Sequence, residues 1–383
     1  MPILWQYLLR HYLRVLFLCT VAFIAVLLVM RLEEIARFAT LGASALSVAG
    51  FVMHQIPYIL PITIPIASLI SSILLVQGLS TTHELTALRA CGMAFKDILA
   101  PILVAAACLT LANFYIVSEV ATNSHLSAGL LKSELRAINP LLLANNKHLM
   151  DLKGFYFEAL GASRLGESAA DVVLATPNKG SDRINLLLAK EMRTAPQMFF
   201  GSNVTLISSL GNNEGEKFDQ LMLENIAEAS ISVQDFAQVI DKKVWTLNND
   251  HLTLPLLLVR LDEERQNLIK GEQANLPQNE LKQITRNINR GYSEIMRRVS
   301  LAFAVFSFTL LGAAFGVGIS RNRSNRGLYF VICLTALYMI AFFAAKSMEH
   351  VLATAALIYF LPHILIVGLS IWALRRAAKG IAL

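Results

Sequence analysis

The chain has 383 residues, of which 55% are hydrophobic and only 16% are charged, and its mean hydropathy is +0.54. Because a soluble domain of average composition has about 25% charged residues, the composition excludes a purely soluble protein. The apolar residues gather in two blocks, 1–120 and 298–383, on either side of a polar block, 121–297. The sequence therefore predicts a multi-pass helical membrane protein with a large soluble insertion.

The net charge of +6 is unevenly divided between these blocks. Residues 121–297 hold 19 Lys and Arg against 21 Asp and Glu, whereas the remaining residues hold 14 against 6. The basic excess thus belongs to the membrane blocks, where orientation by the positive-inside rule explains it, and it does not argue for nucleic-acid binding. The cysteines show neither disulfide nor metal-site spacing. They are Cys19, Cys91, Cys108 and Cys333.

We expect the first membrane half, residues 1–120, to hold spans at about 15–30, 51–79 and 98–117. The run after Arg14 is too long for a cleavable signal and lacks a small-residue cleavage site, so it should remain as the first span. Its helix should continue through 31–38. The second span has prolines at four-residue spacing, typical of either a kinked, packed helix or a mobile gating helix. They are Pro57, Pro61 and Pro65.

The stretch 81–92 joins the second and third spans and is typical of a short capped helix. Thr81 and Glu84 have capping-box spacing, and Gly92 suits the left-handed position that ends a helix. Because so short a helix is marginal alone in water, we expect it to contact a partner. Its apolar face consists of Leu85, Leu88 and Cys91.

The polar block 121–297 should open with a helix and continue as short alternating segments up to residue 250. Many short strands separated by Gly and Asn turns predict an all-β sandwich or jelly roll. The expected strand runs are 155–157, 171–174, 184–187, 197–200, 204–207 and 218–226. Residues 251–297 return to helical sequence that is broken at Pro277.

The second membrane half, residues 298–383, should hold spans at about 299–319, 327–345 and 351–374. Six spans place both termini on one side, together with the stretch 81–92. Basic residues dominate that side ten to two, which predicts that it is cytoplasmic and that 121–297 is periplasmic. The ten are Arg10, Arg14, Arg89, Lys96, Arg321, Arg323, Arg326, Arg375, Arg376 and Lys379; the two are Glu84 and Asp97.

The chain carries no G-x-x-x-x-G-K-[ST], G-x-S-x-G or H-E-x-x-H motif, so the sequence predicts no catalytic or ATP site of its own. The span cores are nearly free of Asp, Glu, Lys and Arg, which weighs against ion-coupled transport of a small polar solute. This pattern favours a protein that moves a lipid or is driven by an external motor. His54, Asn113 and Glu119 lie near predicted span ends.

Two arginines, Arg31 and Arg37, follow the outer end of the first span. They suit interfacial anchoring, or pairing with Glu33 and Glu34. They also suit binding of lipid phosphate groups, which arginine binds well.

Three stretches carry a resemblance to a known family. The first is 61–98, with its proline-rich span, Ile-Ala-Ser-Leu-Ile-Ser-Ser-Ile-Leu and Glu-Leu-Thr-Ala-Leu-Arg-Ala-Cys-Gly; the others are 298–318 and 359–377. With its layout of three spans, an insertion and three spans, the whole chain resembles the lipopolysaccharide-export permeases, the LptF/LptG (YjgP/YjgQ) family. The run Arg136-Ala-Ile-Asn-Pro140 leans towards LptF.

The resemblance implies one half of a transporter, with a periplasmic β-jelly roll and no cofactor bound by this chain. A paralogous chain would complete an LptF/LptG heterodimer, and a cytoplasmic ATPase dimer would use the ATP. Lipopolysaccharide would enter between spans one and five from the outer leaflet of the bacterial inner membrane and pass to periplasmic jelly-roll bridge proteins. The stretch 81–92 matches the coupling helix, with Glu84 as the docking carboxylate and Arg89 and Gly92 on the same motif. Arg31 and Arg37 match loosely the basic lipid-binding positions.

Two alternatives stay open. One is a membrane scaffold that anchors a periplasmic assembly domain without transport, and the other is the permease of a different ABC system, for lipoproteins or another lipid. Two roles stay open for Glu84, which suits either its own capping box or docking to an ATPase.

Overall fold

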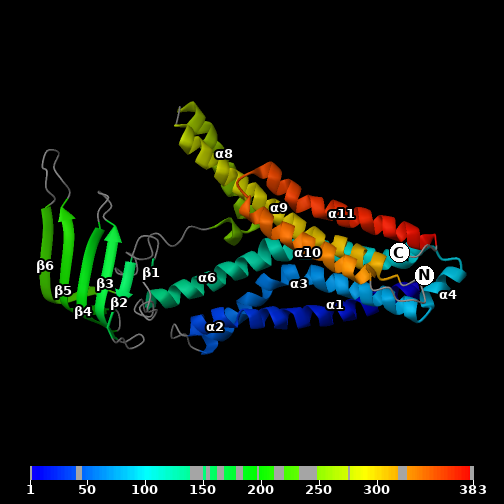
Figure 1. Cartoon of the computed structure of the whole chain (residues 1–383), viewed down its shortest axis with the longest axis horizontal. Coiled ribbons are helices and arrows are strands. Elements are labelled where there is room, and N and C mark those ends of the chain that lie inside the picture. The colour runs from blue at the N-terminus through cyan, green and yellow to red at the C-terminus, as the bar shows by residue number, and fades with distance from the viewer. Residues whose placement is uncertain are drawn as a thin grey trace. The chain divides into compact units, whose positions relative to one another are not determined.

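The computed structural model describes residues 2–39, 45–138, 150–151, 156–161, 168–177, 184–195, 198–210, 220–232, 248–274, 277–317 and 326–379. The chain divides into two compact units (Figure 1). The bundle unit comprises Met1–Leu32, Val52–Ser127 and Asn248–Leu383, and the sheet unit comprises Glu33–Phe51 and Ala128–Leu247.

Six helices in the described ranges are long and apolar enough to cross a membrane, which confirms the predicted number of spans. The third span continues from α5 into a π-helical turn, η1, and on into α6. The spans are built by α1 (Pro2–Met30), α3 (Ala45–Thr81), α5 (Phe95–Tyr115) with η1 (Ile116–Val120) and α6 (Ala121–Ile138), α9 (Gln278–Phe315), α10 (Arg326–Ser347) and α11 (Leu352–Ala378).

The first helix does not continue through residue 38, so that expectation was wrong. The N–H of Arg31 bonds to the carbonyl of Leu28, 3.0 Å away, three residues back instead of four. This tighter turn ends α1, and a separate helix, α2 (Leu32–Ala39), follows.

The proline-rich helix α3 is continuous and well packed. Pro65 has no N–H to offer the carbonyl of Pro61, four residues back. The side-chain amide of Asn113 on α5 donates to that carbonyl instead, at 3.3 Å, and also to the carbonyl of Leu301 on α9. Pro61 and Pro65 are buried, which fits the packed alternative.

Helices α3 and α9 approach each other closely where α9 carries a Gly-x-x-x-Gly pattern. A Cβ on Gly312 would collide with the Ser72 hydroxyl and fall 2.6 Å from the Leu69 carbonyl oxygen. A Cβ on Gly316 would fall 3.1 Å from the Ile73 carbonyl oxygen. Small residues let helix backbones meet in this way inside a membrane.

The inserted domain contains one six-stranded antiparallel sheet with its strands in sequence order. The long strands are β3 to β6, and their apolar core includes Val172, Ala189 and Val204. The jelly roll stays a prediction, since one meandering sheet does not establish it. The strands are β1 (Met150–Asp151), β2 (Tyr156–Ala159), β3 (Ser168–Pro177), β4 (Ile184–Ala195), β5 (Met198–Leu210) and β6 (Gln220–Ser232).

One strand prediction was wrong. The runs 197–200 and 204–207 were expected as separate strands, but 198–210 forms the single strand β5. Asn203 lies within it with φ of 47°, a left-handed conformation that Asn tolerates. The strand therefore continues through this polar residue, which is left out of the pairing between β5 and β6, whereas two separate short segments were expected.

The return to the membrane is a helical hairpin within the bundle unit. A short 3₁₀ turn, η3 (Asn249–His251), leads to α8 (Leu254–Gln273), and Pro277 directly precedes α9. The expected break at Pro277 is thereby confirmed. Leu257 and Leu261 of α8 pack against Ile288 of α9.

Substituting Gly312 by Ala should lower the thermal stability of the detergent-solubilised protein, by about 1–3 kcal/mol, because the added methyl group overpacks the contact between α3 and α9. Gly368→Ala is the matched control, since Gly368 lies in α11 with no atom within 4 Å of the new Cβ. Equal stability of the two variants would contradict the close approach.

Candidate functional site

The short helix α4 (Glu84–Ala90) joins α3 to α5 at the end of the bundle that also holds both chain ends (Figure 1). Its predicted capping box is wrong. Thr81 is the last residue of α3, and its hydroxyl donates back to the carbonyl of Gly78, 2.9 Å away. His83 precedes α4 with a left-handed φ of 60°, and Glu84 is the first helical residue. Glu84 is thus two residues too early to act as the carboxylate of a capping box.

The predicted end of this helix is confirmed. Gly92 has φ of +82°, and its N–H bonds to the carbonyl of Arg89 at 3.0 Å. The N–H of Met93 reaches the carbonyl of Leu88 at 3.2 Å. These two bonds form a Schellman motif, which fixes the direction in which the chain leaves α4.

The apolar face of α4 is shorter than predicted. Leu85 is buried and Leu88 half-buried, and both pack in the core cluster that contains Leu8 and Tyr12 of α1. Cys91 is exposed because the helix ends one residue before it.

Two polar contacts join α4 to the spans α1 and α11. The hydroxyl of Tyr7 on α1 donates to Glu84 Oε2 at 3.3 Å. Arg89 Nη2 donates to the carbonyl of Ala378, the last residue of α11, at 2.8 Å. That carbonyl has no partner within α11 because it belongs to the final turn. With Glu84 in the first turn and Arg89 in the last, both charges also complement the helix dipole.

The two predicted lipid-binding arginines lie in different units. Arg31 belongs to the bundle unit, where its guanidinium lies over the Tyr58 ring, 5.3 Å from the centroid. Tyr58 stacks on His125 at 4.6 Å, and His125 stacks on His251 at 4.4 Å. Arg37 lies in α2, in the sheet unit, and its side chain is outside the described part of the chain.

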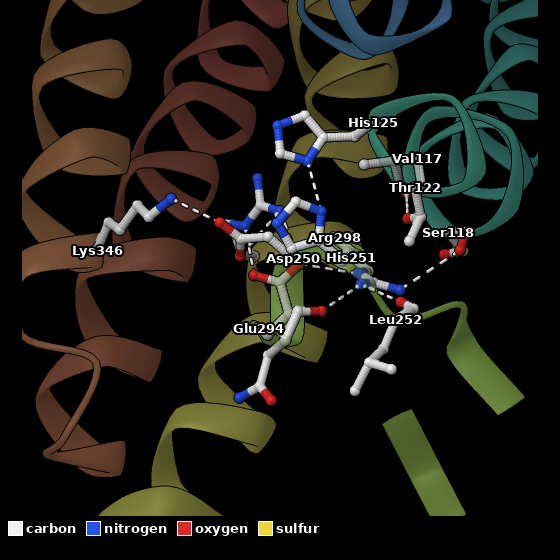
Figure 2. A network of polar contacts seen from close by, with 12 residues as sticks. Val117, Ser118, Thr122, His125, Asp250, His251, Leu252, Glu294, Arg298 and Lys346 are labelled. Carbon is white, nitrogen blue, oxygen red and sulfur yellow. Dashed lines mark hydrogen bonds and ion pairs between the residues drawn. The ribbon is translucent and has the colours of Figure 1, made fainter. Parts of the chain in front are cut away.

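Sequence reasoning missed a cluster of charges, which Figure 2 shows from close by. It lies where α5 ends at η1, whereas α4 lies where α5 begins. Arg298 is 1% exposed, and its Nε donates to Glu294 Oε1 at 2.9 Å. The other guanidinium nitrogens donate to the carbonyls of Ser118, Asn249 and Leu252, the last at 2.7 Å. One side chain thus holds α9, the π-helical turn and the segment that returns from the insertion.

The same cluster extends to α10. Arg297 forms a bidentate pair with Glu294, with bonds of 2.7 and 2.6 Å. Lys346 Nζ lies 2.9 Å from Asp250 Oδ2. Burial alone would raise the pKa of Asp250, but the charges of Arg297 and Lys346 outweigh it and hold that pKa at about 2. The carboxyl therefore stays ionised at neutral pH and pairs with both cations.

The signal for this cluster was present in the sequence. Glu294 precedes Arg297 and Arg298 by three and four residues, a spacing at which helical side chains meet. A second missed group is His363, buried within α11, whose ring nitrogens lie 3.0 Å from the hydroxyls of Ser300 and Ser307. A histidine inside an apolar run indicates such a polar contact between helices.

The polar contacts of Asn113, Arg298, Arg89 and His363 join helices or the segments next to them. Within the described ranges, no group of three or more His, Cys, Asp or Glu is arranged to hold a metal ion. The fold and these contacts define a six-span helical membrane protein with a β insertion.

The family model for "Lipopolysaccharide export system permease LptF/LptG" matches residues 6–376, so the chain belongs to the LptF/LptG family. A comparison with curated proteins found no match. The chain is accordingly a multi-pass inner-membrane permease of the lipopolysaccharide export system. Members of this family are transmembrane subunits without known cofactors, not enzymes, and their partners belong to the same system.

Replacing Arg298 by Met should destabilise the solubilised protein by about 3–5 kcal/mol, because three buried carbonyls and Glu294 lose a charged donor. Arg290→Met on the same helix is the control, since its exposed pair with Glu349 should contribute at most about 1 kcal/mol. Thermal unfolding measures both variants. A loss no larger for Arg298→Met than for Arg290→Met would contradict the structural role of Arg298.

Proposed function

We propose that this chain is the LptF-type half of an LptF/LptG heterodimer, driven by a separate cytoplasmic ATPase dimer. It takes lipopolysaccharide from the outer leaflet of the inner membrane, through gates formed by spans one and five, and passes it to periplasmic jelly-roll bridge proteins. Family membership supports this role. The absence of a phosphate-binding motif from the sequence supports a motor on another chain. The run 136–140 favours LptF over LptG.

We further propose that both termini and α4 are cytoplasmic and that residues 121–297 form the periplasmic domain between membrane halves 1–120 and 298–383. The ten-to-two excess of basic residues supports this orientation. The position of α4 beside both chain ends agrees with it (Figure 1). Arg321 and Arg323, which contribute to that excess, lie outside the described residues.

The observation that carries the proposal is the joining of α4 to the first and last spans through Tyr7 and Ala378. A helix held in this way passes a push from a bound ATPase directly to α1 and α11. Without the capping box, the remaining proposed role for Glu84 is docking. Tyr7 contacts one carboxylate oxygen only, and an ionised carboxylate can accept several further bonds.

Arg31 and Arg37 are proposed to bind the anionic groups of the lipid as it enters. The stack of Arg31 on Tyr58 supports a positioned guanidinium, because stacking limits the orientations of its fork of donors. The planar fork suits phosphate groups.

Glu84→Ala should lower the amount of ATPase that co-purifies with the permease pair by about tenfold, since hydrogen bonds to charged groups contribute about 1.5–3 kcal/mol. Tyr7→Phe removes only the partner within the chain and should leave docking intact. Asp97→Ala removes the other cytoplasmic carboxylate and should be silent. Full lipopolysaccharide export by Glu84→Ala, or a loss of ATPase in Tyr7→Phe as large as in Glu84→Ala, would contradict the docking role.

The double variant Arg31→Glu, Arg37→Glu should reduce photo-crosslinking of lipopolysaccharide to the permease, because like charges repel its phosphates. Lys282→Glu with Arg286→Glu reverses two exposed charges at the outer end of α9 and is the matched control. Unchanged crosslinking in the Arg31 and Arg37 variant would leave both residues as interfacial anchors.

A further inference from the structure

Helix α8 has two halves of different character. Its first six residues, Leu-Pro-Leu-Leu-Leu-Val at 254–259, carry no charge, and the charged run Arg-Leu-Asp-Glu-Glu-Arg follows at once. The first half has apolar residues on the face that packs on α9 and also on its exposed face. Leu257 is fully buried there, whereas Leu256, Leu258 and Val259 remain 56%, 51% and 57% exposed.

The outer ends of α10 and α11 lie beside residues 289 and 290 of α9. Asn289 Nδ2 donates to the carbonyl of His350 at 3.0 Å, and Arg290 pairs with Glu349 at 3.1 Å. Both partners belong to the turn that joins these two spans. Residues 289–290 therefore lie level with the turn that joins α10 to α11.

Leu261 of α8 lies at nearly the same level. It packs directly on Gly291, where an added Cβ would fall 2.5 Å from Leu261 Cδ2. Leu252 lies nine residues before Leu261, and its carbonyl accepts a hydrogen bond from Arg298. Arg298 lies seven residues after Gly291. The two segments therefore run antiparallel, and the beginning of α8 lies on the membrane side of that turn.

The depth of the exposed leucines and valine follows from helix geometry. At 1.5 Å per residue, Val259, Leu258 and Leu256 lie about 3 to 8 Å further into the membrane than Leu261. Amphipathic helices at membrane surfaces bury their apolar side about 5–10 Å into the boundary of headgroups and acyl chains. The charged half of α8 points the other way, into water.

We propose that Leu256, Leu258 and Val259 form a lipid-contact patch that inserts into the outer leaflet beside the spans, with the acyl chains next to the headgroups as its partner. The patch is continuous in depth with the lipid-facing surface of the spans, which includes Leu357, 60% exposed and five residues into α11. It anchors the chain in the membrane where the insertion returns to the bundle. This inference does not rest on the proposed transport role, and it takes only the identity of the leaflet from the proposed orientation.

Fluorescence quenching in proteoliposomes tests the patch. The protein is the full-length chain with its permease partner, the four native cysteines replaced by serine, and a single Leu258→Cys carrying a bimane probe. The lipid carries a nitroxide on the acyl chain near the headgroup. We expect quenching of the Leu258 probe at least about twofold stronger than that of a probe in water, as its depth predicts.

Two exposed apolar positions provide matched controls. Ile269→Cys lies on the same helix with 54% exposure but eleven residues further along, and its probe should be unquenched. Leu357→Cys lies at a similar depth in α11 and should be quenched like Leu258. Quenching at Leu258 no stronger than at Ile269 would overturn the proposal. So would a photo-crosslinker at Leu258 that captures the partner permease and no lipid.

Discussion

A membrane interior offers no water, so every backbone carbonyl released by a helix end, a proline or an irregular turn needs a donor from the chain itself. Two side chains supply such donors here: Asn113 bonds to the carbonyl that Pro65 leaves free, and Arg298 to carbonyls of the π-helical turn and the returning segment. At the exposed end of the bundle, Arg89 donates in the same way to the end of α11. Each donor lies on a different helix from its acceptor, so satisfying the backbone also joins the helices.

These hydrogen bonds between helices lie at both ends of the bundle and hold its helices to one another. At one end, α4 is bonded to the first and last spans and packs through Leu85 into their shared core. At the other end, Arg298 and Glu294 hold α9 to the segment that returns from the insertion. In the proposed coupling to a separate ATPase, these contacts carry a push on α4 to the spans.

The spans, their number and the end of α4 at Gly92 could be predicted from the sequence, because apolar run length and the left-handed preference of glycine are local signals. The start of α4 could not, because Thr81 continues the preceding helix and only the folded chain shows where that helix stops. The strand β5 was wrongly predicted as two strands, because the sequence does not show that the chain passes through the left-handed Asn203 without leaving the sheet. The pairing of Glu294 with Arg297 and Arg298 follows from their spacing, but the carbonyls that Arg298 binds come from distant segments, which local spacing cannot reveal.

The most direct test of the joint between α4 and the last span is the distance between spin labels at Thr86 and Lys379 in the complete transporter. Both positions are exposed, and they flank the bond from Arg89 to Ala378. If α4 and α11 move as one body, the distance distribution will be the same without nucleotide and with ATP bound. A shift of about one helical turn, roughly 5 Å, would show that α4 moves independently and would contradict direct transmission.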